Sequence, residues 1–371
     1  MDCEAEKTVL TPDLVSCRQK FIVSEKEVFR FVEEVFIKLG ATPEVAKCVA
    51  ESIADADNKG HYSHGMNRLG LYITDVDQGV LDLKSTPIIL AESAATAWVD
   101  GNNALGVVVG NFCMQLAIKK AKESGIGWVV AKGSNHIGVV NFFPEQALKE
   151  GLLGFTCCNT SPVVAPWGAK EPALGTNPIS FAAPGVNDDS FVMDISTSGV
   201  SRGKIELYVK HNQPLPVGWA IGSDGKYVTD AKDAYEKGAL TPLGGENNGH
   251  KGYGLGLMAE AMSGILAGSK FGPFIRKWGK KIERGDLGQC YACINPEFFA
   301  PGYNERMSCL MDYLRNMDPV DPENPVQVPG DWERNNKKKH QDKGGVSYSR
   351  VQLQWTNDLA KKLGVAPLKF K

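Results

Sequence analysis

The chain has 371 residues, enough for two domains or for one large domain with a sizeable core. Its formal net charge of −2 excludes the strongly basic surface that binds nucleic acids or anionic membranes. Hydrophobic residues make up 43% of the chain, but no apolar run reaches the ~18 residues that span a bilayer. We therefore predict neither a nucleic-acid partner nor a membrane partner.

The amino-terminal segment and the cysteines predict a cytoplasmic protein. Residues 1–7 are acidic and lack the apolar region of a signal peptide. The nine cysteines are odd in number and have no disulfide-framework spacing, which favours reduced thiols. Cys157-Cys158 and Cys290-x-x-Cys293 lie in apolar runs without a histidine cluster, so we interpret them as core residues and predict no metal site.

The first eighty residues predict three helices. Ser24-Glu25-Lys26-Glu27 is a capping box before an amphipathic run that ends at Leu39, just before Gly40. Thr42-Pro43 is typical of a helix start, and the apolar spacing of this second helix continues to about residue 56. After a break at 58–60, we expect a third helix that carries residues 63–72.

After residue 79 the pattern predicts an α/β body, because short apolar runs alternate with helical stretches. We expect strands at 88–90, 97–99, 128–131, 153–158, 179–182, 191–195 and 289–294, and helices at 107–123, 142–149 and 252–266.

The carboxy-terminal part predicts a polar segment followed by one helix. Residues 318–345 are rich in Pro, Asn and Lys, which favours a solvated loop; a localisation signal at 337–340 is the alternative. Residues 348–363 predict a helix that ends at Gly364. We expect one discontinuous helical domain, 20–85 with 305–371, around an α/β domain at 86–304.

Ser63-His64-Gly65, followed by Arg68 and Tyr72, is the strongest candidate for chemistry. On the expected helix, residues at i, i+4 and i+8 share a face, so His64, Arg68 and Tyr72 would point at one volume. An imidazole can transfer a proton near neutral pH, and a guanidinium can bind a carboxylate through two parallel hydrogen bonds. The alternative is a helix with these residues at its polar margin.

Three further segments place glycine and polar residues at turns. Residues 133–138, with His136, follow an expected strand, where free N–H groups can bind a phosphate; a surface histidine is the alternative. Residues 175–180 form a turn that enters a strand. Residues 249–254 precede a helix and could bind a phosphate, with Lys251 as a point charge.

Two observations limit these interpretations. Asp194 ends an apolar strand, where it either orients a histidine or caps the next helix. Residues 254–259 fit the form G-x-G-x-x-A, but no strand precedes them and no acidic residue follows at the required distance. We therefore exclude a Rossmann site there.

Together and in this order, the segments resemble the malate/L-lactate dehydrogenase family, which includes sulfolactate and ureidoglycolate dehydrogenases and cyclic ketimine reductases. The family is distinct from the Rossmann-type malate and lactate dehydrogenases. The resemblance runs from about residue 23 to 294 and resumes in the last helix. It implies an α/β, non-Rossmann nicotinamide-binding fold, with a mixed sheet and helices plus a discontinuous helical domain from both termini. It also implies a homodimer that uses NAD or NADP.

The resemblance implies a role for each matching residue. Ser63, His64 and Asp194 match the catalytic relay, with His64 as the proton donor. Substrate-side positions match Arg68, Tyr72 and His136. Cofactor-side positions match Ser134, His136, Thr176, Asn177, Pro178, Lys251, Gly252 and Arg334.

The chain departs from the family pattern at residues 246–248, which look like an insertion, and in the long polar segment 317–345. Our sequence-based hypothesis is an NAD(P)-dependent oxidoreductase that transfers a hydride between nicotinamide and a small 2-hydroxy or 2-oxo acid such as malate or lactate. The alternatives are a cyclic ketimine reductase and a catalytically silent metabolite-binding dimer.

Overall fold

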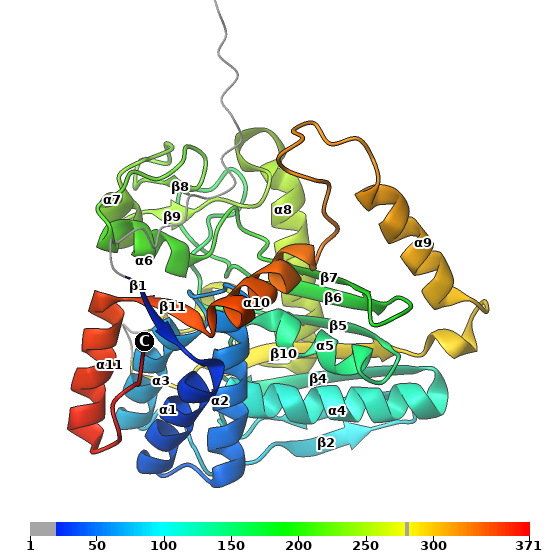
Figure 1. Cartoon of the computed structure of the whole chain (residues 1–371), viewed down its shortest axis with the longest axis horizontal. Coiled ribbons are helices and arrows are strands. Elements are labelled where there is room, and N and C mark those ends of the chain that lie inside the picture. Colours follow the sequence, from blue (N-terminus) through cyan, green and yellow to red (C-terminus); the bar gives the residue numbers. More distant parts are fainter. Residues whose placement is uncertain (1–19, 279–281) are drawn as a thin grey trace, which may run out of the picture.

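A computed structural model describes residues 20–278 and 282–371 and confirms the mixed α/β class (Figure 1). The strands are β1 (Lys20–Val23), β2 (Ile88–Glu92), β3 (Thr96–Asp100), β4 (Ile126–Ser134), β5 (Leu153–Cys158), β6 (Ile179–Pro184), β7 (Ser190–Ile195), β8 (Ala220–Ile221), β9 (Ala239–Leu240), β10 (Leu287–Ile294) and β11 (Val346–Ser349). The helices are α1 (Glu25–Lys38), α2 (Pro43–Asn58), α3 (Leu69–Asp77), α4 (Gly106–Ser124), α5 (Pro144–Leu148), α6 (Arg202–Lys210), α7 (Ala231–Glu236), α8 (Gly245–Glu260), α9 (Tyr303–Arg315), α10 (Asp331–Lys343) and α11 (Arg350–Leu363).

The central sheet of the described chain has the order β2-β3-β4-β10-β5-β6-β7, and all seven strands expected from the sequence belong to it. It is mixed, because β3 and β4 are parallel whereas the other neighbours are antiparallel. Strand β10 lies between β4 and β5 although it is the last strand of this sheet in the sequence. No helix of the described residues is long and apolar enough to cross a membrane.

Helices cover the sheet on both faces. Helix α4 packs on β4 and β10, and α8 continues as a π-helix, η3 (Ala261–Ile265), that packs on β5 and β10 from the other side. The cysteines of β5 and β10 are buried in these two layers, which confirms their interpretation as core residues. Residues 254–259 lie inside α8, so they do not form the strand-to-helix turn of a Rossmann site.

The expected helix over residues 63–72 is wrong in its first half. Residues 61–65 form a turn, a 3-10 helix η1 spans Met66–Arg68, and α3 starts only at Leu69. Gly65 has φ −87° and ψ −132°, which is not helical, and a Cβ at this residue would overlap the carboxyl group of Asp57. This tight contact imposes the turn in place of the regular helix.

The polar segment at 318–345 is not a loop throughout, because residues 331–343 form α10. Gly330 and Gly344 flank the helix in left-handed conformations, Asp331 and Glu333 lie in its first turn, and buried His340 anchors it. Three other boundaries also differ from expectation. Helix α8 starts at residue 245 and includes 246–248, α5 is shorter than expected, and residues 348–349 belong to β11.

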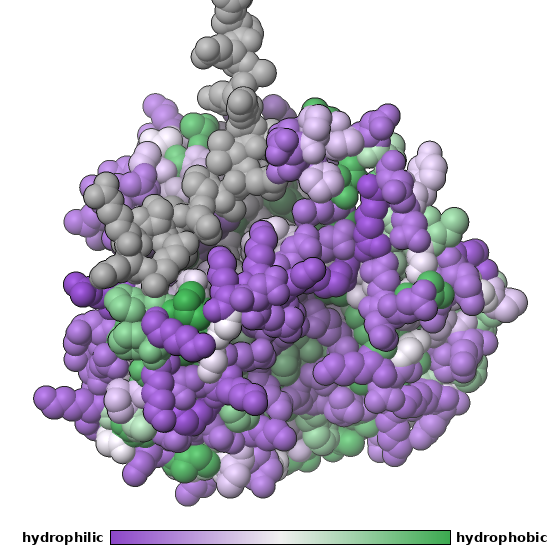
Figure 2. Space-filling view, in the orientation of Figure 1, coloured by the Kyte–Doolittle hydropathy of each residue, from purple (hydrophilic) through white to green (hydrophobic). Residues whose placement is uncertain are grey.

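Elements from the two ends of the described chain lie side by side (Figure 1). Strand β1 pairs with β11 in an antiparallel register, α11 packs against α1, and α10 packs against α2. Helix α9 instead contacts β6, where Ser308 accepts a hydrogen bond from the Val186 N–H. The division into two domains remains a prediction. The face shown in Figure 2 is mainly hydrophilic, with apolar side chains in small groups.

Candidate active site

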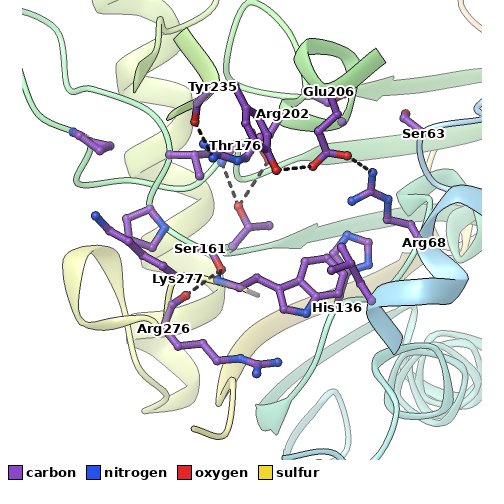
Figure 3. Close-up of a pocket in the computed structure, with 18 of the residues that line it drawn as sticks. Ser63, Arg68, His136, Ser161, Thr176, Arg202, Glu206, Tyr235, Arg276 and Lys277 are labelled. Carbon is purple, nitrogen blue, oxygen red and sulfur yellow. Dashed lines mark hydrogen bonds and ion pairs between the residues drawn. The ribbon is translucent and has the colours of Figure 1, made fainter. Parts of the chain in front are cut away.

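A cavity of about 450 Å³ lies between the turn at residues 61–65, helix α6 and residues 276–278 (Figure 3). The predicted residues Ser63, His64, Arg68, His136 and Thr176 line it. A smaller cavity shares His64, His136 and Thr176 with the large one and extends toward Pro178 and Gln289. The structure therefore brings the main candidates for catalysis and substrate binding to one place.

Ser63 and His64 form a hydrogen-bonded pair, with 2.9 Å between Ser63 Oγ and His64 Nδ1. The turn that carries them is closed by a backbone bond from the His64 N–H to the His61 carbonyl oxygen, 2.8 Å long. Desolvation by the surrounding protein, aided by the positive charges of Arg68 and His61, lowers the pKa of His64 to about 3. The imidazole is therefore neutral at physiological pH, which suits a proton acceptor.

His136 also lines the cavity, and its ring stacks on that of His64 with 5.9 Å between the ring centres. Its Nδ1 lies 2.8 Å from the Tyr72 hydroxyl oxygen and accepts a hydrogen bond from the Gly138 N–H at 3.2 Å. Since Nδ1 is an acceptor, the neutral ring carries its proton on Nε2. Burial lowers the pKa of His136 well below its usual value. Trp278 stacks on the ring at 4.5 Å and fixes its orientation.

Arg68 pairs with Glu206 of α6, with 2.8 Å between Nη2 and Oε2 (Figure 3). The Arg68 side chain is 9% exposed, and its buried Nε has no hydrogen-bond partner among the described residues. Tyr235 of α7 donates a long hydrogen bond of 3.5 Å to the other oxygen of Glu206. The guanidinium thus retains capacity for a second carboxylate.

Tyr72 and Asp75 of helix α3 contact residues that line the cavity. Tyr72 is buried and contacts two residues that line the cavity, His136 and Trp278, and burial raises the pKa of its hydroxyl. Asp75 forms a bidentate ion pair with Arg276 and accepts a hydrogen bond of 2.9 Å from Trp278 Nε1. Helix α3 therefore positions the wall formed by residues 276–278.

Asp194 lies at the end of β7, outside the set of residues that line the two cavities. Its Oδ2 accepts a hydrogen bond of 3.0 Å from the Asn141 N–H. Burial raises the pKa of Asp194, against the opposing effect of His61 and Lys59. Within the described chain, no hydrogen bond joins Asp194 to Ser63 or His64, so its membership of the relay stays a prediction.

The predicted cofactor residues separate into two groups. Thr176 and Pro178 line the cavities, whereas Ser134 lines neither and is buried with no partner for its Oγ among the described residues. Asn177 instead supports the turn from behind, because its Nδ2 donates to Glu260 at 2.8 Å and to the Gly256 carbonyl oxygen at 3.1 Å.

The second group lies away from these cavities. Lys251 is exposed on α8, where Gly252 packs against Leu243. Arg334 of α10 pairs with Asp331 at 2.6 Å. The structure does not bring these three predicted residues to the two cavities.

The cavity wall formed by α6, α7 and residues 276–278 could not be predicted from the sequence. This wall contains Arg202, Gly203, Glu206, Tyr235, Arg276 and Trp278. Each residue comes from a segment without a recognisable motif, so only the helical pattern of 202–210, directly after the Asp194 segment, could have drawn attention to it.

Comparisons with known proteins agree with this geometry. A family model described as malate/L-lactate dehydrogenase matches residues 23–355. A malate dehydrogenase of Pyrococcus horikoshii is 36% identical, with 93% of this chain and 96% of the relative covered. An L-sulfolactate dehydrogenase of Methanocaldococcus jannaschii is 38% identical, with 91% and 95% covered. The crystal structure of malate dehydrogenase from Entamoeba histolytica has a TM-score of 0.89 at 30% identity and covers 94% of this chain and 99% of that one. Because the family model matches most of its length, the chain belongs to the malate/L-lactate dehydrogenase family.

Proposed function

We propose that the protein is an NAD(P)-dependent oxidoreductase that interconverts a small 2-hydroxy acid and the corresponding 2-oxo acid. The observation that carries the proposal is the shared cavity of the Ser63–His64 pair and Arg68. This arrangement combines a proton-transfer group with a carboxylate-binding group, as a 2-hydroxy acid requires. The names of the relatives support the same class of reaction.

Each side chain has a defined task in this reaction. Neutral His64 accepts the proton of the substrate hydroxyl and returns it in the reducing direction, while Ser63 holds its Nδ1. Arg68 binds the substrate carboxylate through its guanidinium, whose Nε has no partner in the described chain. The Nε2–H of His136 donates a hydrogen bond to the substrate oxygen.

The residues around the two cavities fit a nicotinamide cofactor, which supplies or accepts the hydride when bound. Asn135 lines both cavities, and its Oδ1 is buried without a partner in the described chain, so the NH₂ of a carboxamide group can satisfy it. Thr176 and Pro178 border the same space. We assign NAD or NADP to this site and retain Lys251, Gly252 and Arg334 as proposed contacts of its distal part.

We propose that Asp194 acts on His64 indirectly, through its electrostatic interaction with His61. The carboxyl group faces His61 and Lys59, and His61 is one of the charges that act on His64. We infer that Asp194 moderates this positive charge, so Asp194→Asn is expected to reduce turnover less than a His64 substitution does. An equal loss for both variants would instead place Asp194 in direct contact with the relay.

We also propose a cytoplasmic homodimer. An exposed apolar face contains Ile88 and Leu90 of edge strand β2, Trp98 of β3, Ile265 of η3 and Leu266 directly after it. These parts are adjacent, because Trp98 Nε1 donates to the carbonyl oxygen of residue 267 at 2.8 Å. Exposed apolar patches of this kind mark protein interfaces. Sedimentation equilibrium of the protein and of Leu266→Glu tests the proposal; a monomer in both cases contradicts it.

The test of the proposed function is a titration of the purified protein with NADH and NADPH, monitored by fluorescence. A panel of 2-oxo acids and one cyclic imine acid follows in the same cuvette, monitored by absorbance of the reduced cofactor. We expect binding and turnover of a 2-oxo acid. Turnover of the imine acid alone would establish the ketimine reductase, and a folded protein that binds neither cofactor would favour the catalytically silent alternative.

A further inference from the structure

Asp57 lies at the end of α2, directly behind the turn that carries Ser63 and His64. Its side chain is wholly buried, with an exposed fraction of 0%. Its Oδ2 accepts two hydrogen bonds, from the Met66 N–H at 2.9 Å and from the Tyr348 hydroxyl of β11 at 2.6 Å. Its Oδ1 is buried and has no hydrogen-bond partner among the described residues.

The carboxyl group of Asp57 fixes the turn at two points. It touches Gly65, where a side chain of any size would overlap it. It also binds the N–H of Met66, the first residue of η1. Residues 65 and 66 connect His64 to Arg68, so the position of the carboxyl group determines how the proton-transfer group and the carboxylate-binding group are placed relative to each other.

No cation faces this buried carboxyl group in the described chain. The ionisable groups around it are Tyr348 of β11, which binds it, and Tyr62 of the turn, which lies near Tyr348 and contacts His340 of α10. Lys59, on the same helix, pairs instead with Asp55 and Glu145. Burial without a counter-charge raises the pKa of Asp57 to about 7, against the opposing effect of its two hydrogen bonds.

We propose that Asp57 is a positioning residue of the active site proposed above, and that its neutral carboxyl form holds the turn of Ser63 and His64 in its active geometry. The inference rests on the proposed function. In the neutral form, Oδ2 still accepts the hydrogen bonds from the Met66 N–H and the Tyr348 hydroxyl. Ionisation places a negative charge on a buried carboxylate that faces no cation and whose Oδ1 has no partner among the described residues. The turn therefore loosens as Asp57 loses its proton.

The pH dependence of turnover distinguishes this role from a purely structural one. His64 titrates far below neutrality, so we expect the change in kcat near neutral pH to follow Asp57. In the wild type kcat falls as pH rises through this range. In Asp57→Asn the amide oxygen still accepts the Met66 N–H but cannot ionise, so we expect kcat to stay flat, near the low-pH value of the wild type, from about pH 6 to about pH 8.

Two variants on β11 make the test specific. Tyr348→Phe removes one donor to the carboxylate, so the midpoint of the kcat profile is expected to move upward by about one pH unit. Ser347→Ala, on the same strand and without a hydrogen bond to Asp57 in the described chain, is expected to keep the wild-type midpoint. An unchanged midpoint in Tyr348→Phe, or a wild-type profile in Asp57→Asn, would overturn the proposal.

A second measurement does not need dehydrogenase activity. Hydrogen–deuterium exchange of a peptide that covers residues 61–68, corrected for the intrinsic pH dependence of exchange, reports how tightly the turn is held. We expect protection to decrease as pH rises in the wild type and to be constant in Asp57→Asn. If the wild type shows this change but no turnover, the proposed function fails and the positioning role stands. If protection is identical in both proteins at every pH, the positioning role is wrong.

Discussion

Arg68 illustrates how one side chain serves both the resting protein and the proposed substrate. Its guanidinium is nearly buried and pairs with Glu206, yet its Nε lacks a partner in the described chain. A carboxylate bound across Nε and Nη2 would satisfy both donors at once. Glu206 already contacts Nη2 and therefore competes with a substrate for this edge of the guanidinium.

Replacing Glu206 with Gln tests this competition. The amide keeps the shape of the side chain but removes a negative charge 2.8 Å from Arg68. We expect KM for an anionic substrate to fall by roughly fivefold, the effect of about 1 kcal/mol, with little change in kcat. Steady-state kinetics at several ionic strengths provide the measurement. A rise in KM would show that Glu206 orients Arg68 for the substrate instead of competing with it.

Substitution of His64 tests proton transfer. His64→Asn removes the imidazole from the cavity, so we expect kcat to fall by about 10²–10⁴-fold while cofactor binding is retained. His211→Asn, at the end of α6 and outside both cavities, serves as the matched control and is expected to keep wild-type activity. Near-normal kcat in His64→Asn would remove this residue from proton transfer.

The sequence predicted those residues of the site that share a short segment or lie at a glycine turn. Ser63, His64 and Arg68 are close together in sequence, and His136 follows a strand, so their chemistry could be recognised locally. Glu206 and Trp278 could not be recognised this way. Each acquires its role only through a partner that lies far away in the sequence, Arg68 and His136 respectively.

At the scale of elements, helix α10 shows where composition misleads. The segment is almost without apolar residues, so its pattern resembles a solvated loop. Its helix is stabilised by acidic residues in the first turn and by contacts that reach the end of α2. His340 Nδ1 lies 2.8 Å from the Asn58 carbonyl oxygen, and Asn336 donates to the Lys59 carbonyl oxygen at 3.1 Å. Helix α10 thus caps the carboxyl end of α2, which the sequence of either helix alone does not reveal.

Replacing His340 with Ala tests this cap. The substitution removes the donor to Asn58 and the partner of the Tyr62 hydroxyl, so we expect the free energy of unfolding to fall by about 2 kcal/mol. Lys339→Ala changes an exposed neighbour on the same helix and is expected to have an effect below about 0.5 kcal/mol. Urea denaturation of both variants provides the comparison, and equal stabilities would contradict the capping role.

At the scale of the molecule, the strands were predictable but their order was not. Every expected strand forms, because short apolar runs between turns specify strands locally. The insertion of β10 between β4 and β5 depends on contacts that span more than a hundred residues. One example is the backbone pairing of β10 with β5, in which Cys290 lies opposite Cys157. Register and strand order of this kind are decided by packing of the whole sheet, so no single segment encodes them.

Asp57 also predicts how the stability of the whole molecule depends on pH. Burial raises its pKa in the folded protein from 3.8 to about 7. Between these two values the folded state keeps a proton that the unfolded chain has released, so the free energy of unfolding falls as pH rises. The full effect is on the order of 4 kcal/mol and persists above the upper value.

Comparison with Asp57→Asn isolates this contribution. The lowered pKa values of His64 and His136 act in the opposite direction below about pH 6.5 but are common to both proteins. We therefore expect the variant to gain stability relative to the wild type as pH rises from about 4 to about 7. Urea denaturation across this range measures the difference. A difference that is independent of pH would show that Asp57 does not titrate there.

The hydrogen bond between Tyr348 and Asp57 also has a consequence for co-translational folding. The two residues are 291 positions apart, and β11 reaches the turn of Ser63 and His64 only after nearly the whole chain has been made. At typical rates of ~5–20 residues per second, translation of the intervening segment takes roughly 15–60 seconds. During that interval the nascent chain already contains its proton-transfer histidine but not the strand that secures it. The proposed active site is therefore completed late in synthesis, when β11 pairs with β1 and Tyr348 reaches Asp57.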